Sequence, residues 1–464
     1  MDFRQVTVAD LAAQVTARTL SARELVGAAL DNIERLDEQV GAFVAVDGEA
    51  ALADAAAIDE RLAAGEDVGP LAGIPIGVKD LDDAAGFVTT KGSLLFADDD
   101  PQTEDSPLVE RLRAAGCVVV GKTNTPEQGW KADTVNRVFG ATHNPWSLER
   151  SAGGSSGGAA AALAAGLVPL ATGSDGGGSI RIPSAVCGLS GLKPSLGRVP
   201  TGAGWPGLST NGVMARQIRD VTLALDAVVG PEPTDLSSLP MPDASWSRSL
   251  AELHAPRKVA WSPTLGYAKV DSEVLSVCEA AIDKLASLGT EVVVIDEVWA
   301  DDPVRDWLTL VGAYTLRSMD EFRDSDQWSS VDSGLVALME WARAKVTPLR
   351  MANALQACHD ANLRLVELFH QVPLLLTPTV AGQTPVIDQG GTIDGEQGAD
   401  WVAFTYPFNM TRSPAGTVCA GFTADGMPVG LQAVGPQHGD VVVLRLLALL
   451  EDALALDTVT PFGA

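Results

Sequence analysis

Apolar and polar residues recur with helical spacing near the N-terminus and give way to short uncharged runs further along the chain. The stretch LVGAALDNIERL carries its apolar residues on one helical face, and Ser21 with Glu24 precedes it as a capping box. Helices are predicted over residues 25–36, 50–64 and 108–115, and short buried strands over 74–78 and 117–120. Helices that alternate with short apolar strands indicate an α/β fold.

The second half of the chain shows the same alternation after a Pro/Ser-rich loop that begins near residue 230. Strands are predicted over 257–263, 291–297, 372–379 and 427–435, and helices over 272–288 and 440–454. The pattern from 302 to 369 is helical throughout. The aromatic residues of this region either shape a pocket or simply pack; they are Trp307, Tyr314, Trp328 and Trp341.

The composition is that of a folded protein with a sizeable core. Apolar residues make up 46% and charged residues 20% of the 464 positions, a length that allows one large domain or two or three ordinary ones. The net charge of −28 arises from 32 basic against 60 acidic residues. Such a charge favours solubility and disfavours a nucleic acid or an anionic membrane as a partner.

Cysteine usage and the lack of a recognisable signal predict a cytoplasmic protein. The five cysteines are scattered without a CxxC pair, which indicates a reducing compartment and neither a disulfide framework nor a zinc site. The N-terminal MDFRQVTVADL has no apolar segment typical of a signal peptide. The longest low-charge stretch, residues 159–173, is short for a membrane span and fits a buried helix and strand.

Two serines within glycine clusters are the strongest chemical signal. Ser155 lies in GGSSGG and Ser179 in DGGGSIR, separated by an Ala-rich run and a short apolar stretch. This order predicts loop, helix, strand and loop, and the two loops can meet at one end of an α/β sheet. Glycines let backbone N–H groups approach a ligand, and around a nucleophilic serine such groups form an oxyanion hole. A flexible Gly/Ser linker is disfavoured because the flanking runs are apolar.

A base that could activate a serine is suggested by GIPIGVKDL. Lys79 ends an apolar run in this segment, and burial would lower the pKa of a lysine and leave it neutral. Serine–lysine pairs are a variant of the serine–histidine arrangement. Two alternatives stay open: Lys79 extends to solvent from the strand end, or one of the five histidines arrives from elsewhere.

The segment GKTNTPEQGW resembles part of a phosphate-binding loop, but its spacing disfavours one. The preceding glycine, Gly116, opens the strand itself, so no loop is left to surround a phosphate.

Taken together, GIPIGVKD, GGSSGG and GSDGGGSIRIPSAVCGLSGLKPS resemble the amidase signature family. GKTNTPE, NPW, LLLTPT and DGMPVGLQ match its pattern in the same order, so the resemblance covers nearly the whole chain. It implies a single amidase signature domain over residues 1–464, with a central mixed β-sheet surrounded by helices. The catalytic motifs would lie within 65–232, and the variable helices of about 300–370 would cover the active site.

The resemblance also implies residue roles. Ser179 matches the nucleophile, Ser155 the serine that follows a cis peptide bond and relays a proton, and Lys79 the general base. The implied oxyanion hole consists of the N–H groups of Gly176, Gly177, Gly178 and Ser179. The family usually has threonine or another side chain where this chain has Gly176. As an alternative, Ser155 caps the following helix through a trans peptide. No metal or organic cofactor is implied.

The predicted function is hydrolysis of the C–N bond of amides, including nylon-type cyclic amides and anilides, with carbamates (urethanes) needing the same attack. Gln128, Gly129 and Trp130 are predicted to line the pocket, with ordinary core packing as the alternative for Trp130. The partners expected are a small substrate and water, in a monomer or homodimer. Three other functions are weighed: the A subunit of a tRNA-dependent amidotransferase, a catalytically silent binding protein, and an ester hydrolase.

Overall fold

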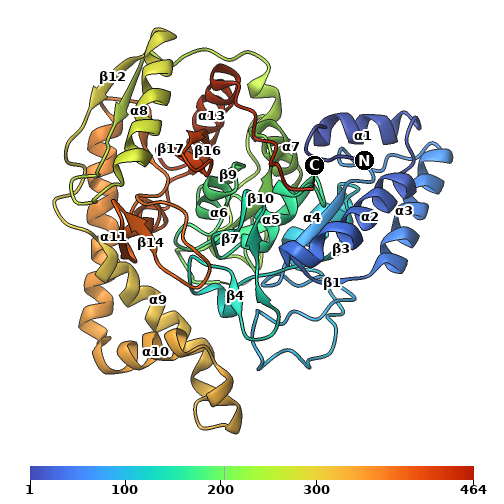
Figure 1. Cartoon of the computed structure of the whole chain (residues 1–464), viewed down its shortest axis with the longest axis horizontal. Helices are drawn as coiled ribbons and strands as arrows, with labels where there is room; N and C mark the ends of the chain where they lie inside the picture. The colour runs from blue at the N-terminus through green and yellow to red at the C-terminus, as the bar shows by residue number, and fades with distance from the viewer. Residues whose placement is uncertain (203, 464) are drawn as a thin grey trace.

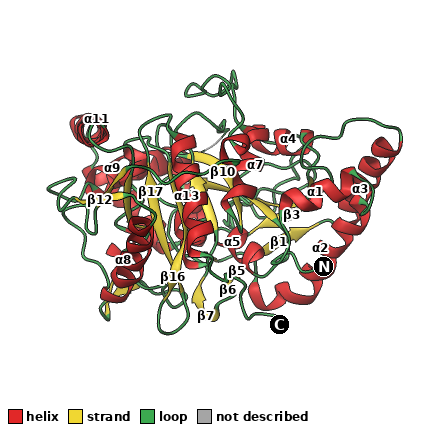
Figure 2. Cartoon of the chain, turned by 90° about the horizontal axis from the view of Figure 1, so that it is seen from above, coloured by secondary structure: helices red, strands yellow, loops and turns green. Residues whose placement is uncertain are grey.

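The computed structural model describes residues 1–202 and 204–463 and centres on one eleven-stranded mixed β-sheet (Figures 1 and 2). In spatial order its strands are β1 (Phe43–Val46), β3 (Val118–Thr123), β2 (Pro75–Lys79), β8 (Leu170–Asp175), β10 (Thr210–Ala215), β9 (Ser190–Lys193), β16 (Ala415–Phe422), β17 (Pro428–Val434), β13 (Leu375–Pro378), β11 (Lys258–Trp261) and β12 (Glu291–Val294). The expected α/β fold with a central mixed sheet is confirmed.

Parallel and antiparallel pairs occupy different parts of this sheet. β2 runs parallel to both β3 and β8, and β11 runs parallel to β12 and β13. The strands between these groups, β10, β9, β16 and β17, pair antiparallel. As a result, the ends of β2 and β8, which carry Lys79 and Ser174, open on the same edge of the sheet.

Helices pack around the sheet, and the two chain termini lie side by side (Figure 1). The principal helices are α1 (Val8–Thr16), α2 (Ala22–Val40), α3 (Gly48–Ala63), α4 (Pro107–Ala114), α5 (Gly157–Ala164), α6 (Arg181–Val186), α7 (Ile218–Val228), α8 (Ser272–Ser287), α9 (Val304–Met319), α10 (Ser333–Lys345), α11 (Pro348–Phe369), α12 (Pro407–Met410) and α13 (Asp440–Leu454). The predicted capping box of Ser21 and Glu24 is present at α2. α9, α10 and α11 confirm the predicted helical region and extend along one side of the molecule.

The helix α5 is buried along its whole length, which explains the glycines at its start. A Cβ atom at Gly157 would lie 2.3 Å from Thr134 Oγ1, and one at Gly158 would lie 2.3 Å from the backbone N of Asn124. Only glycine permits this close approach of the helix to the Thr134 hydroxyl and to the Asn124 backbone. Gly157 and Gly158, the second half of GGSSGG, therefore let α5 pack closely beside the strands that carry Lys79 and Ser174.

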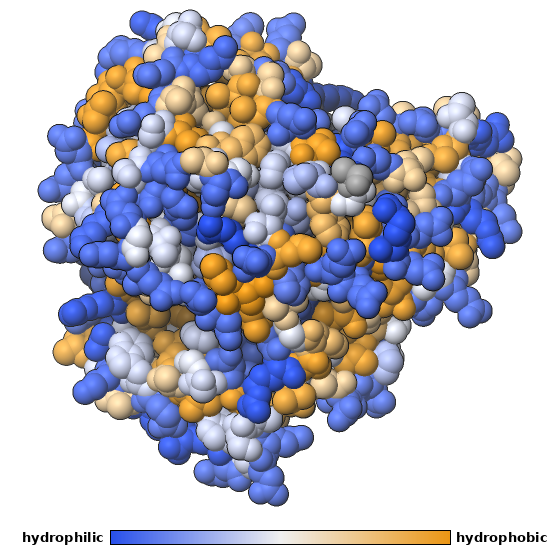
Figure 3. All heavy atoms as spheres, viewed as in Figure 1, coloured by the Kyte–Doolittle hydropathy of each residue, from blue (hydrophilic) through white to orange (hydrophobic). Residues whose placement is uncertain are grey.

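The surface alternates hydrophilic and hydrophobic areas on the face seen in Figure 3. Within the described chain, none of the helices combines the length and the apolar character that crossing a membrane would require.

Candidate active site

Lys79 is the last residue of β2 and is completely buried, as is the whole strand. Its Nζ atom lies 2.8 Å from Ser155 Oγ and 3.0 Å from Ser174 Oγ. The structure thus excludes the alternative in which Lys79 extends to solvent. It brings the predicted base and the predicted relay serine within hydrogen-bond distance.

Burial lowers the pKa of Lys79 to about 7, against the opposing charges of Asp82 and Asp175. Asp82 is also buried, and its carboxylate oxygens accept long hydrogen bonds of 3.4 Å from Thr172 and Asn211. Burial in turn raises the pKa of Asp82 to about 6. A lysine in this environment can be neutral at neutral pH and can accept a proton.

Ser155 lies in the loop before α5, and the peptide bond between Gly154 and Ser155 is cis, as predicted. The capping alternative is wrong, because the N-cap of α5 is Ser156 and the Ser155 hydroxyl faces Lys79. Gly129 lies beside this hydroxyl: a Cβ atom there would be 3.1 Å from Ser155 Oγ.

Ser179 lies between the glycine loop 176–178 and α6, and it is half-buried. Its carbonyl oxygen accepts a 3.2 Å hydrogen bond from the Ser156 N–H. The two serine clusters, remote from each other in the sequence, therefore meet at the edge of the sheet where β2 and β8 end.

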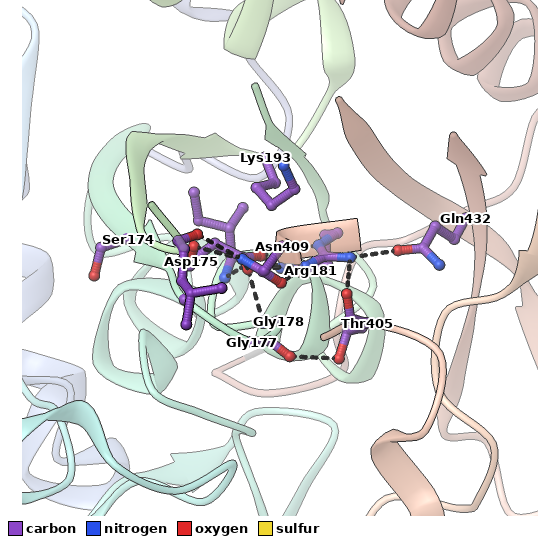
Figure 4. Close-up of polar contacts among 12 residues, drawn as sticks. Ser174, Asp175, Gly177, Gly178, Arg181, Lys193, Thr405, Asn409 and Gln432 are labelled. Carbon is purple, nitrogen blue, oxygen red and sulfur yellow. Dashed lines mark hydrogen bonds and ion pairs between the residues drawn. The ribbon is translucent and has the colours of Figure 1, made fainter. Parts of the chain in front are cut away.

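A buried ion pair supports the Ser179 loop (Figure 4). Arg181 binds Asp175 through Nε and Nη2 at 2.9 and 2.8 Å, and both side chains are fully buried. The guanidinium also donates to the Thr405 carbonyl, Gln432 and Asn409. Burial alone would raise the pKa of Asp175, but the Arg181 charge and hydrogen bonds hold it well below its usual range.

The glycine loop supplies some of the predicted oxyanion donors but not all of them. The Gly178 N–H donates to Asp175 Oδ1 at 2.7 Å, so it is not free for a substrate, and the prediction for Gly178 is corrected on this ground. The N–H groups of Gly176, Gly177 and Ser179 have no such partner in the described part of the chain. These three remain candidate donors to a substrate oxyanion.

Bulky side chains occupy the space beside each of the three glycines. A Cβ atom at Gly176 would lie 2.7 Å from Trp205, and one at Gly177 would lie 2.4 Å from Trp307. Thr405 fills the corresponding space beside Gly178, at 2.4 Å. Trp205 thus takes up the volume that a side chain at position 176 would need, which explains this departure from the family pattern.

The three predicted pocket residues lie in and next to the short 3₁₀ turn Glu127–Gly129. Gly129 is beside Ser155, as described above. Gln128 has a positive φ of 55° and is half-buried. Trp130 packs against a hydrophobic cluster that includes Leu95, Met319 and Leu335. This contact is the core packing expected as the alternative to a pocket role. A role for these residues in substrate binding stays a prediction.

Two features of the site have no obvious signal in the sequence. Ser174 supplies the second hydroxyl at Lys79, and only its position in the folded sheet brings it there. Trp307 donates its Nε1–H to the Gly176 carbonyl at 3.1 Å from a helix 131 residues away in sequence. Asp175 could have been found, since a carboxylate often accepts from an N–H two or three residues on.

The chain is similar to known amidases in both sequence and structure. The model of the family described as Amidase matches residues 24–444. An acylamidase of Rhodococcus erythropolis is 38% identical, over 96% of this chain and 95% of its own length. A bacterial aryl acylamidase of the amidase signature family superposes with a TM-score of 0.93 at 28% identity, over 99% of both chains. The structure of 6-aminohexanoate cyclic dimer hydrolase complexed with substrate superposes at 0.89 with 29% identity, again over 99% of both.

Proposed function

Since the chain belongs to the amidase family and is an amidohydrolase, we propose that Ser179, Ser155 and Lys79 carry out the hydrolysis. The observation that carries this proposal is the 2.8 Å contact between Lys79 Nζ and Ser155 Oγ in a fully buried environment. A buried neutral amine beside a hydroxyl is suited to accept a proton from it.

The proposed reaction passes through an acyl-enzyme. Ser179 Oγ attacks the substrate carbonyl, its proton moves to Ser155 Oγ, and the proton of Ser155 moves to Lys79. The oxyanion is held by the N–H groups of Gly177 and Ser179, with that of Gly176 beside them. Lys79 then returns the proton to Ser155, and Ser155 passes its own proton to the leaving amine as the C–N bond breaks. Water then attacks the ester of Ser179 by the same relay, which releases the acid.

Amides of aryl amines are the proposed leading substrate class, with carbamates next. Trp205, Trp307 and Tyr406 lie together near the glycine loop, and Trp307 stacks on Tyr406 with ring centroids 5.4 Å apart. Aromatic side chains of this kind suit a flat aromatic substrate. The names acylamidase and aryl acylamidase of two similar proteins point the same way. A panel of anilides, aliphatic amides and carbamates, with product amine measured, tests this ranking; preferred turnover of aliphatic amides would refute it.

Exchange of Ser179 for alanine tests the nucleophile. Ser179→Ala removes one half-buried hydroxyl, so the fold should persist while the turnover number falls by roughly three to six decades. A fluorophosphonate should label Ser179 in the wild type and leave the variant unlabelled. Labelling at a different serine, or near-normal turnover in the variant, would refute the assignment.

The cysteines support a cytoplasmic location for the protein. All five thiols are free and four of them are buried, a state that a reducing compartment maintains. We place the protein in the cytoplasm on this basis.

A further inference from the structure

The peptides of the glycine loop are each anchored through their carbonyl groups. The Gly176 carbonyl accepts from Trp307 Nε1 at 3.1 Å, and the Gly177 carbonyl accepts from Thr405 Oγ1 at 2.6 Å. The Gly178 carbonyl accepts from the Ile182 N–H at 2.7 Å, within the first turn around α6. Each anchor comes from a different part of the chain, and Figure 4 shows the one made by Thr405.

A carbonyl anchor also fixes the N–H on the other side of the same peptide. In a planar trans peptide the C=O and the following N–H point in opposite directions. The Thr405 anchor therefore turns the Gly178 N–H toward Asp175, which it reaches at 2.7 Å. In the same way, the Trp307 anchor sets the direction of the Gly177 N–H, which is left without a partner in the described chain.

The Trp307 indole is itself held firmly. One face stacks on Tyr406 at an interplanar angle of 30°, and Trp205 meets the indole edge to face with centroids 6.2 Å apart. The Tyr406 hydroxyl donates to Asp302 at 2.5 Å, which fixes the ring on which Trp307 stacks. The close approach of Trp307 Cζ2 to Gly177 further limits rotation of that peptide.

From these contacts we propose that Trp307 is a positioning residue of the oxyanion hole, which aims the Gly177 N–H at the developing negative charge by binding the opposite end of the same peptide. The inference rests on the proposed function. It gives a chemical task to a residue of the helical region 302–369, where sequence alone leaves the aromatic residues as packing or pocket groups. A donor fixed in advance stabilises the transition state more than the bound substrate.

The test compares Trp307→Phe with Trp299→Phe. Phenylalanine keeps an aromatic ring but loses the N–H donor. Trp299 is a matched control because its Nε1 also donates to a backbone carbonyl, that of Ala361 at 3.3 Å, in the separate cluster beneath α11. We expect kcat of Trp307→Phe to fall about tenfold or more, short of the 10²–10³-fold loss on removal of an oxyanion donor itself. KM should stay within about twofold, and the control should keep both constants.

Fluorophosphonate labelling of Ser179 separates the possible outcomes, with rates expressed per labelled site so that misfolded protein does not count. Complete but slower labelling of Trp307→Phe, together with the fall in kcat, supports the inference. Wild-type kcat per labelled site, a rise in KM alone, or an equal fall in kcat for Trp299→Phe would overturn it while leaving the Ser179 assignment intact. An absence of labelling at Ser179 in the wild type would overturn the proposed function, and the inference with it.

Discussion

Two neighbouring parallel strands each bury a lysine, and only one of the two has the surroundings of a base. Lys79 on β2 and Lys122 on β3 are both fully buried. Lys122 lies 3.4 Å from Asp80 and donates to the Asp82 carbonyl and to Thr89. The hydrogen bonds of Lys79 Nζ within the described chain go to hydroxyl groups alone, those of Ser155 and Ser174.

The hydrogen-bond partners of these two buried lysines, and not their burial, distinguish the candidate base from the lysine of the ion pair. Burial lowers the pKa of both lysines. An adjacent carboxylate favours the charged ammonium, so Lys122 belongs to an ion pair that holds the loop after β2. Hydroxyl groups carry no charge and can pass protons, so Lys79 can exchange a proton with its neighbour.

Replacing each lysine by methionine should give opposite results, and this is the largest effect that the comparison of the two lysines predicts. Lys79→Met should lower kcat by about 10²–10⁴, because the base is lost, and leave the free energy of unfolding nearly unchanged. Lys122→Met should lower the free energy of unfolding by about 3–5 kcal/mol, because Asp80 is left buried without its cation. Urea unfolding and kcat per Ser179 label measure both properties. Equal losses of activity in the two variants would remove the distinction.

Loss of the Ser155 hydroxyl, which is proposed to connect Lys79 to Ser179, should approach the effect of losing the lysine. In Ser155→Ala, Lys79 keeps only Ser174 as a hydroxyl partner, so kcat should fall by about 10²–10³. Ser156→Ala is the matched control, since Ser156 is the neighbouring residue and its side chain makes no capping hydrogen bond to α5; its hydroxyl donates only a long 3.5 Å hydrogen bond to the Ser174 carbonyl. Normal turnover by Ser155→Ala would show that protons reach Lys79 by another route.

Some of this contrast could be predicted from the sequence. The apolar run before Lys79, the serines within glycine clusters and the loop–helix–strand order between them are local patterns, and each appears in the structure as expected. The partner of Lys122 could not be predicted, because Asp80 follows the end of β2 and meets Lys122 only through the pairing of β2 with β3 in the folded sheet.

The central strands β9, β10 and β16 and the Trp307 contact lie outside the sequence predictions for a related reason. β10 reads TNGVMA and is buried at every position, so it shows neither the alternation of a half-exposed strand nor a continuous apolar run. Its identity as a strand comes from its neighbours β8 and β9. Trp307 reaches Gly176 through tertiary packing alone, and no spacing within the sequence reports such a contact.

The pH dependence of kcat/KM should follow the pKa of Lys79. Because burial lowers this pKa to about 7, the amine is protonated at lower pH and cannot accept a proton. Activity should therefore be complete above about pH 8 and fall about tenfold for each pH unit well below 7. Lys79→Arg should show no active form, because guanidinium stays protonated. A rate that stays constant from pH 5 to 8 would contradict a lysine base.

The smallest predicted effect concerns the second hydroxyl at Lys79. Ser174 Oγ can accept a hydrogen bond from the amine at 3.0 Å, and such a bond favours the protonated ammonium over the neutral amine. Removing it in Ser174→Ala should therefore lower the pKa of Lys79 further, so that the acid limb of the kcat/KM profile moves to lower pH.

The Ser174 hydroxyl also fixes the direction in which the lone pair of the neutral amine points. Its loss should reduce the plateau rate by only about two- to tenfold, because Ser155 still contacts the amine. Ser174→Thr keeps a hydroxyl and should restore both the plateau and the position of the limb. A shift of the limb to higher pH would mean that Ser174 donates to the neutral amine instead, and that the base is held in the opposite orientation.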